Sequence, residues 1–302
     1  MSLSKLSGEN AVALAFSKLS VDEQGIILGQ LRNTLAPHHA LYYSSTCKEL
    51  RALLPPAVRQ QLRTDYEAAM ALCAKMGIWN CKELRQARTI EWREGRLSVA
   101  NLATLATLGS VLPFLERLIL VEDATGPDGV QPLAEGLVAG ALPALIDFEI
   151  SDTLVGDAGA AAIAAALDRG ALPRLRSLTL ANAAIGDAGL VALAPALRRR
   201  PGLEYLCLGG NPLGDEGLAA LLGAPPPAGT PRPRPAGALE NLEVLDLEDS
   251  QISDAGYATL AVALYRGALP ALEELALDGS PAFGVVKAIV YQALAWSRAS
   301  ST

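Results

Sequence analysis

One short pattern of leucines returns at nearly constant spacing along most of the chain. The pattern is L-x-x-L-x-L, and its six clear copies start 30, 30, 28, 39 and 30 residues apart. Their apolar positions are Leu115-Leu118-Leu120, Leu145-Phe148-Ile150, Leu175-Leu178-Leu180, Leu203-Leu206-Leu208, Leu242-Leu245-Leu247 and Leu272-Leu275-Leu277. A degenerate copy, Ala87-Ile90-Trp92, comes 28 residues earlier. One such unit cannot bury its apolar face alone, so we expect seven units to stack.

Each unit combines the pattern of a short strand with that of a helix. Apolar residues alternate through the L-x-L part, which is the period of a strand. A G-D-x-G motif and an Ala/Leu-rich helical stretch follow, and the aspartate is suited to capping that helix. The motif occupies residues 156–159, 186–189 and 214–217, with S-D-A-G at 253–256. Several units end in G-A-L-P, where glycine ends the helix and proline fixes the turn.

These features resemble the ribonuclease-inhibitor-like type of leucine-rich repeat, over residues 87 to 277. A period of about 28–30 residues with a full helix is typical of that type. The resemblance implies an α/β solenoid of about seven repeats, with a curved parallel β-sheet on the inner, concave side and helices outside. The family places Asn three residues after the last strand leucine, where its side chain bonds neighbouring backbone. In this chain only Asn211 matches that position.

The repeats are expected to form one of two domains. Residues 1–86 lack the pattern and are predicted to be an α-helical N-terminal domain that caps the solenoid. The repeat domain covers 87–302 and ends in a capping helix at 283–297. Its 39-residue step contains a Pro-rich insertion at 223–238, for which we expect an exposed, extended loop. The insertion is either a tolerated extension or a docking segment.

Part of the N-terminal domain, residues 19–53, faintly resembles an F-box. The matching residues are Ile26, Ile27, Leu31, Leu35, Leu41, Cys47 and Leu50. An F-box docks the adaptor of a ubiquitin ligase, so the resemblance implies a substrate receptor. The family opens with Leu-Pro, whereas Ser20 follows Leu19 here. The alternative is a plain helical cap on the first repeat.

Charge and composition exclude several classes of function. The net charge of −7 disfavours nucleic-acid binding, which needs a basic face, and fits a partner with a basic surface. The four cysteines form no C-x-x-C pair and the two histidines are adjacent, so we expect no metal and no cofactor. Reduced thiols predict an intracellular compartment, here the cytoplasm. No signal peptide and no membrane-inserted segment are expected.

The sequence contains no arrangement that predicts an enzyme. The aspartates of the G-D-x-G motifs are spread one per repeat, which capping explains. No nucleophile is tied to His38 and His39, and no phosphate-binding loop is present. The run Arg198-Arg199-Arg200 follows a helix, where its charge complements the negative helix end.

The exposed face of the strands is therefore the predicted binding surface. The last two repeats place four carboxylates on neighbouring strands, and strands lie about 4.8 Å apart, so we expect one acidic patch. A tyrosine one strand away could anchor a partner. The predicted protein-binding residues are Tyr205, Asp246, Glu248, Glu274 and Asp278, with Asp147 and Glu149 on an earlier strand.

These observations favour a non-catalytic protein–protein interaction scaffold that binds a basic protein through its concave face. One alternative is the F-box-like substrate receptor of a ubiquitin ligase. A second is a structural subunit of a larger complex. A third, a regulator of a small GTPase, fits less well because such regulators end in an acidic tail and this chain ends in Arg298-Ala299-Ser300-Ser301-Thr302.

Overall fold

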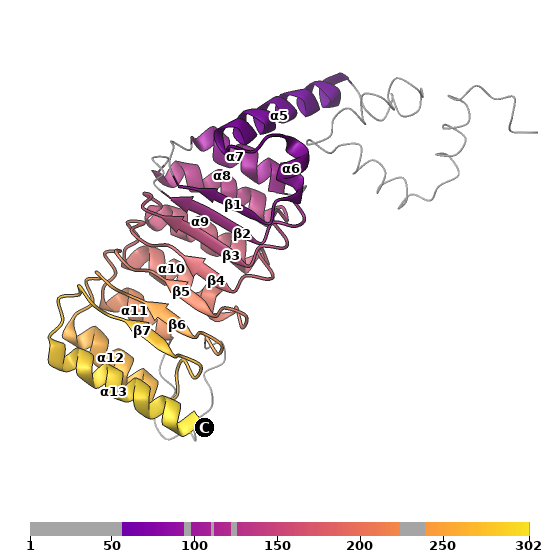
Figure 1. The fold of residues 1–302 in the computed structure, drawn as a ribbon. Coiled ribbons are helices and arrows are strands. Elements are labelled where there is room, and N and C mark those ends of the chain that lie inside the picture. Colours follow the sequence, from indigo (N-terminus) through magenta and orange to yellow (C-terminus); the bar gives the residue numbers. More distant parts are fainter. Residues whose placement is uncertain (1–55, 94–97, 110–111, 122–125, 224–238, 302) are drawn as a thin grey trace, which may run out of the picture. The chain divides into compact units, whose positions relative to one another are not determined.

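The computed structural model describes most of the repeats and a short part of the N-terminal region (Figure 1). The described residues are 56–93, 98–109, 112–121, 126–223 and 239–301. The chain divides into two compact units, residues 1–87 and 88–302. The F-box-like segment at 19–53 lies outside the described residues, as does the insertion after Gly223.

Two helices are described in the first unit. Helix α5 (Pro56–Lys75) buries Leu62, Ala69 and Leu72, whose spacing places them on one side of the helix. Helix α6 (Cys81–Gln86) begins after Asn80, whose side-chain oxygen accepts the N–H of Glu83 at 2.9 Å. This part of the chain is helical, as its pattern predicts.

The second unit contains one parallel sheet whose seven strands follow each other in sequence order. The strands are β1 (Thr89–Trp92), β2 (Arg117–Val121), β3 (Asp147–Ser151), β4 (Ser177–Thr179), β5 (Tyr205–Cys207), β6 (Val244–Asp246) and β7 (Glu274–Ala276). The central apolar residues of the repeats pair side by side, for example Leu118 with Phe148 and Leu178 with Leu206. The predicted strands, including the degenerate first copy, are confirmed.

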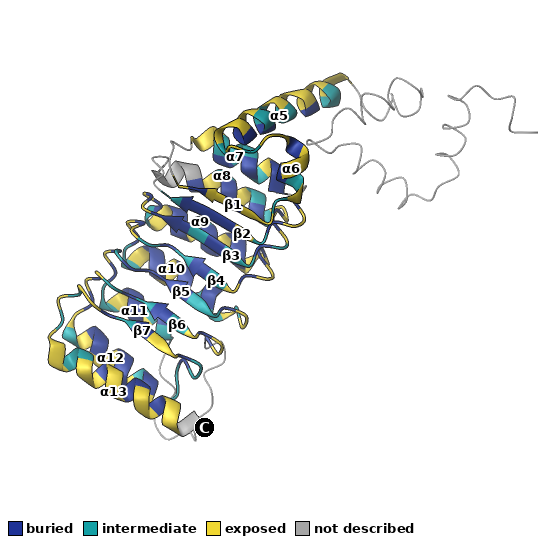
Figure 2. Ribbon diagram, in the orientation of Figure 1, coloured by how far each residue is buried: buried dark blue, intermediate teal, exposed yellow. Residues whose placement is uncertain are grey.

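A helix follows each strand and packs beside the helix of the next repeat (Figure 1). The helices are α7 (Val99–Leu108), α8 (Gly126–Val138), α9 (Gly156–Asp168), α10 (Asp187–Arg198), α11 (Asp215–Leu222), α12 (Asp254–Tyr265) and α13 (Gly284–Ser301). The leucines of the repeats and the inward faces of the helices form the core between the two layers (Figure 2). The predicted α/β leucine-rich repeat solenoid is confirmed.

The aspartates of the G-D-x-G motifs cap a different helix from the one that follows them directly. Asp157 lies in the first turn of α9, yet its Oδ1 accepts the N–H groups of Gly186 and Gly189, at the start of α10, at 2.7 and 3.0 Å. Asp187 likewise accepts the N–H groups of Gly214 and Gly217, at the start of α11. The expected capping chemistry is present, but it joins two repeats.

The same relation continues to the end of the chain. Asp215 accepts the N–H and hydroxyl of Ser253, the N-cap of α12, and Asp254 accepts the N–H of Phe283 just before α13. The close approach also explains the second glycine of the motif. A Cβ on Gly189 would lie 2.6 Å from Asp157 Oδ1 and 3.0 Å from its Cα.

The arginine run acts on a helix end, but again across a repeat boundary. The guanidinium of Arg200 donates to the carbonyl oxygens of Leu167, Ala171 and Leu172, at or just beyond the C-terminal end of α9. Arg199 forms an ion pair with Asp168, the last residue of α9. Partial burial lowers the pKa of Arg200, although Asp168 opposes this effect. Arg199 and Arg200 therefore bond to the repeat that precedes their own.

Asn211, the match to the family's asparagine position, forms hydrogen bonds through both its side-chain oxygen and its side-chain nitrogen. Its Oδ1 accepts the N–H groups of Ala183 and Ile185 at 3.0 Å, and its Nδ2 donates to the carbonyl oxygens of Leu180 and Leu208. The side chain is buried and joins the loops of two repeats.

Candidate binding surface on the sheet

The strand residues between the buried leucines lie on the sheet face opposite the row of helices (Figure 1), and the strand register arranges them in rows. One row contains Arg117, Asp147, Ser177, Tyr205, Val244 and Glu274. The next row contains Ile119, Glu149, Thr179, Cys207, Asp246 and Ala276. The predicted surface thus exists as a continuous face, but its members differ in exposure and in their contacts.

Four positions expected to be exposed are buried: Ser151 and Gly209 outside the two rows, and Ile119 and Cys207 in the second row. Ile119 and Cys207 are only 5% and 6% exposed. Both lie between two paired strands, and neighbouring side chains at strand spacing can shield a side chain of modest size. The expectation that these strand positions face solvent is therefore wrong at the four buried residues.

Cys207, Asp246 and Tyr205 form the best-connected part of the surface. Cys207 Sγ donates to Asp246 Oδ2 at 3.1 Å, while Asp246 Oδ1 accepts the N–H of Glu248 at 2.9 Å. Burial raises the pKa of Cys207 to about 12, so the thiol remains a protonated donor at neutral pH. Burial also raises the pKa of Tyr205, and the neighbouring Cys207 and Asp246 add to this effect. Tyr205 therefore presents a neutral, half-buried phenol beside a carboxylate.

The carboxylates of the last two repeats are close enough to influence one another. Repulsion by Asp246 is the main cause that raises the pKa of Glu248, followed by partial desolvation and by the charges of Asp278 and Asp249. We call Asp246, Glu248, Asp249 and Asp278 the acidic cluster. Asp249 is absent from the sequence-based set because it belongs to the turn after the strand, where its φ is +49°.

Glu274 does not belong to this cluster. Its register partner is Val244, whereas Asp246 pairs with Ala276. Two residues along a strand correspond to about 7 Å, so Glu274 lies in the next row and is exposed there.

The two earlier carboxylates also differ from each other. Asp147 Oδ2 forms an ion pair with Arg117 Nε on the adjacent strand at 2.9 Å, so its charge is largely compensated. Glu149 Oε1 accepts the hydroxyl of Ser151 at 2.8 Å, and its charge contributes to the raised pKa of Tyr205 and of Cys207. Glu149 thus extends the negative field toward the tyrosine, and Asp147 does not.

A second tyrosine adjoins the acidic cluster from the last helix. Burial raises the pKa of Tyr291, and the charges of Asp278 and Glu248 raise it further. The sequence pattern of α13 predicts only a closing helix, so this residue is absent from the predicted set. The sequence did contain a signal, because Tyr291 is an aromatic residue in the predicted closing helix that follows the last strand and Asp278.

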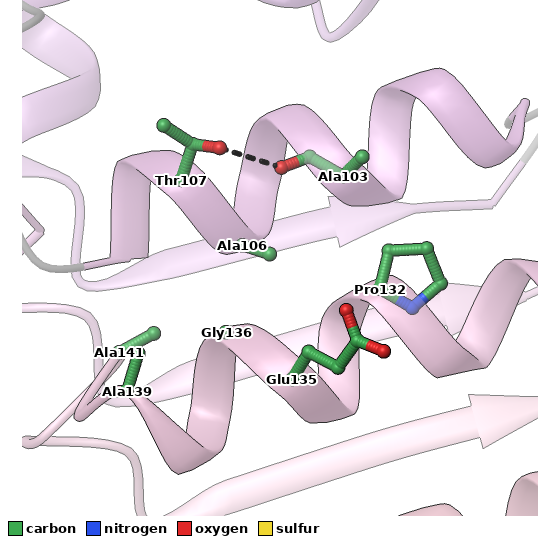
Figure 3. A pocket seen from close by; sticks show the side chains of 8 residues that line it. All are labelled: Ala103, Ala106, Thr107, Pro132, Glu135, Gly136, Ala139 and Ala141. Atoms are coloured by element: carbon green, nitrogen blue, oxygen red, sulfur yellow. Dashed lines mark hydrogen bonds between the residues drawn. The ribbon is translucent and has the colours of Figure 1, made fainter.

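One pocket away from the sheet face lies between two helices. An open pocket of about 500 Å³ lies between α7 and α8 and is lined mainly by small residues, with Glu135 as its charged side chain (Figure 3). It reflects close helix packing, since a Cβ on Gly136 would lie 2.5 Å from the Cβ of Ala106.

Within the described ranges, no three His, Cys, Asp or Glu side chains are arranged to hold a metal ion. No described helix is long and apolar enough to cross a membrane.

A comparison with protein-family models agrees with the repeat pattern. A family model described as a leucine-rich repeat matches residues 172–194, 203–222 and 238–261. No curated protein matches the chain. Among solved structures, internalin C2 of Listeria monocytogenes is 20% identical over 72% of this chain and 85% of its own, with a TM-score of 0.41. An internalin F of the same organism is 12% identical over 74% of this chain and 92% of its own, with a TM-score of 0.26.

Proposed function

We propose that this chain, which contains leucine-rich repeats, binds a protein with a basic surface through the exposed face of its sheet. The observation that carries the proposal is the acidic cluster beside two aromatic side chains, Tyr205 and Tyr291. Paired strands hold Tyr205 and Asp246 in fixed register, and the N–H of Asp249 donates to the carbonyl oxygen of Asp278, so much of the surface is formed before a partner arrives. Leucine-rich repeat proteins generally mediate protein–protein interaction, which supports the same reading.

The chemistry of the surface favours Arg- or Lys-bearing partners. The raised pKa of Glu248 shows that its neighbours repel its charge, and a cation placed among these carboxylates relieves that repulsion. The planar rings of Tyr205 and Tyr291 provide apolar contact beside the charges, which suits a guanidinium especially well. Asp147 is left out of this surface because Arg117 already neutralises it.

Charge reversal at the cluster tests the proposal. A triple variant with Asp246→Lys, Glu248→Lys and Asp278→Lys is compared with wild type in affinity purification followed by mass spectrometry, at low and high salt. A matched control reverses three exposed carboxylates of the repeat unit that lie outside the sheet face, Glu135→Lys, Glu216→Lys and Glu240→Lys. We expect a set of basic proteins that wild type and control retain, and that high salt or the triple variant releases.

Retention of every partner by the triple variant would overturn the proposal. Equal loss from the control would also overturn it, because only net charge would then matter. Circular dichroism melting curves verify that both triple variants remain folded.

Finer assignments rest on the sequence pattern and complete the proposal. We assign the repeats to the ribonuclease-inhibitor-like type because of their period and full helix, and we place the protein in the cytoplasm because of its cysteine usage. The domain boundaries at 86 and 87 follow from where the repeat pattern starts. A role as a structural subunit of a larger complex would use the same non-catalytic surfaces, and cross-linking of the native assembly distinguishes it.

The ubiquitin-ligase alternative depends on residues 19–53 and stays a prediction from their resemblance to an F-box. Its test is direct binding of the full chain to the adaptor subunit of such a ligase. Substitution of Leu31 and Leu35 by Asp should abolish binding, with the triple Lys variant of the acidic cluster as the control that retains it.

A further inference from the structure

The last two helices present large apolar side chains to solvent. Val262 and Tyr265 on α12, and Val285, Ile289 and Trp296 on α13, are between 41% and 73% exposed. We call these five residues the α12–α13 patch. Positions 285, 289 and 296 are spaced four and seven apart, so they form one stripe along α13. The rings of Tyr265 and Trp296 lie 5.1 Å apart and join this stripe to α12.

Helix α13 is apolar on two sides. Its inner side buries Val290, Ala293 and Leu294. Its charged residues, Lys287 and Arg298, donate to the backbone oxygens of Ser280 and Leu272, which directs them away from the stripe. A helix that only closes a repeat stack would expose a polar outer side, as terminal repeats usually do. Figure 2 shows that one side of α13 is exposed, and Val285, Ile289 and Trp296 are exposed apolar residues of this helix.

We infer that the α12–α13 patch is the interface through which two copies of this chain associate about a two-fold axis. A two-fold interface must be complementary to itself, and an uncharged apolar surface satisfies this condition. Each copy carries a net charge of −7, and the acidic cluster would repel a second copy at the sheet face. None of the five patch residues is charged, so a contact there brings no like charges together.

The size of the patch agrees with a dimer interface. Partly exposed side chains of this size present on the order of 100 Å² each, so the five together present on the order of 500 Å² of apolar surface. A standard interface buries about 800 Å² on each partner, with an apolar centre and a polar rim. The patch supplies that centre, with two aromatic residues of the kind that dominate binding energy. Ala288, Gln292 and Ala295 lie alongside it and supply the surrounding contact.

Helix α13 also ends the row of helices in the repeat unit. Each helix from α8 to α12 packs against a helix on both sides, whereas α13 packs against α12 alone among the described helices. A second α13 would extend this row by the same helix-against-helix packing. Helices of the two copies can then approach closely, because alanines alternate with the larger patch residues.

Sedimentation equilibrium of the full chain, up to about 100 µM, tests the inference. We expect wild type to form a dimer of twice the 31.5 kDa chain mass. The double variant Val285→Glu/Ile289→Glu should weaken dimerisation at least tenfold by placing four carboxylates in the interface. The matched control is Leu154→Glu/Val191→Glu, which makes the same kind of change at exposed apolar positions outside the patch. Control dimers should persist.

A mixing experiment locates the contact. Val285→Glu/Ile289→Glu and Val285→Lys/Ile289→Lys should each be monomeric alone, and a mixture of the two should form heterodimers. Should a double variant fail to melt cooperatively, the single Val285→Ser replaces it, because this side chain is 73% exposed. The inference is overturned by a wild type that stays monomeric at every concentration. Dimers that tolerate the Glu variants, or that the control disrupts equally, also overturn it.

Discussion

The first repeat and the repeats that contain α10 and α11 cap their helices in two different ways. In α7, the Ser98 hydroxyl accepts the N–H of Asn101, and Asn101 Oδ1 accepts the N–H of Ser98. This capping box is local and forms within one turn. In α10 and α11, the cap is an aspartate that belongs to the preceding repeat. A local cap stabilises one helix, whereas an inter-repeat cap forms only when two repeats are stacked.

The comparison teaches where cooperativity resides in this unit. Stability of repeat proteins is a sum of intrinsic terms and terms for neighbouring interfaces. Asn211, Asp157, Asp187 and Arg200 all contribute to the interface term, because each bonds to backbone of a neighbouring repeat. We therefore expect the centre of the unit to unfold as one block, and the first repeat to be less tightly coupled.

The largest effect is expected from Asn211→Ala. The substitution removes hydrogen bonds to two N–H groups and at least two carbonyl oxygens in a buried site. We expect a loss of about 3–5 kcal/mol in the free energy of unfolding, measured by urea denaturation. Ser250→Ala is the matched control at the same position of the next repeat, where the Ser250 hydroxyl is buried and meets no partner among the described residues. A control as destabilised as Asn211→Ala would contradict the explanation.

A smaller effect is expected from Gly189→Ala. The added methyl group would meet both the side chain and the Cα of Asp157, so α9 and α10 must separate or the cap must break. We expect a loss of about 2–3 kcal/mol. Gly202→Ala serves as control, since a Cβ there has 3.8 Å to its nearest neighbour, the oxygen of Leu175. If Gly189→Ala and Gly202→Ala lower the free energy of unfolding equally, the close approach of Asp157 is not the reason for glycine at position 189.

The comparison of caps is tested directly by Asp187→Ala and Ser98→Ala. Each removes a side-chain acceptor from a helix start, and we expect each to cost about 1–2 kcal/mol. Their effects on coupling should differ. Hydrogen exchange should show faster opening in both α10 and α11 for Asp187→Ala, and in α7 alone for Ser98→Ala. Exchange that rises in one helix for both variants would show that the aspartate cap does not couple repeats.

The smallest effect is expected from Glu248→Gln. Its pKa is raised above the ordinary value of 4.5 in the folded protein. The unfolded chain therefore loses its proton first as pH rises, and folding stability falls through this range. We expect Glu248→Gln to be slightly more stable than wild type at pH 7, with no difference below the ordinary pKa. Melting curves at pH 4 and pH 7 measure this, and a variant less stable at pH 7 would contradict the assigned repulsion.

Much of the fold follows from spacing, because stacked repeats convert a sequence period into a structural period. The leucine positions predict the strands, their order and their buried face. The contacts between repeats are less predictable. The Asp157 motif indicates a cap, but the helix it serves depends on how far apart α9 and α10 lie. The two helices approach closely at Gly189, where a Cβ would lie 3.0 Å from the Cα of Asp157.

The candidate site likewise has features that the repeat spacing predicts and contacts that it does not predict. Register predicts that Asp246 and Glu248 share a face with Tyr205, and the structure places them together. Compensation by Arg117 at Asp147, the burial of Cys207, and the approach of Tyr291 depend on side-chain direction and on a helix beyond the last strand. Neither side-chain direction nor the position of that helix follows the repeat spacing, so the leucine pattern does not predict them.

The direction of the inter-repeat caps has a consequence for how the protein is made. From α10 to α13, an aspartate that bonds to the start of each helix lies in the preceding repeat, upstream in the chain. A ribosome therefore delivers each of these helices after its cap has emerged. As the chain grows at its C-terminal end, the aspartate for each of these helix starts has already been synthesised. Removing repeats from the C-terminal end should be tolerated better than removing them from the start of the array.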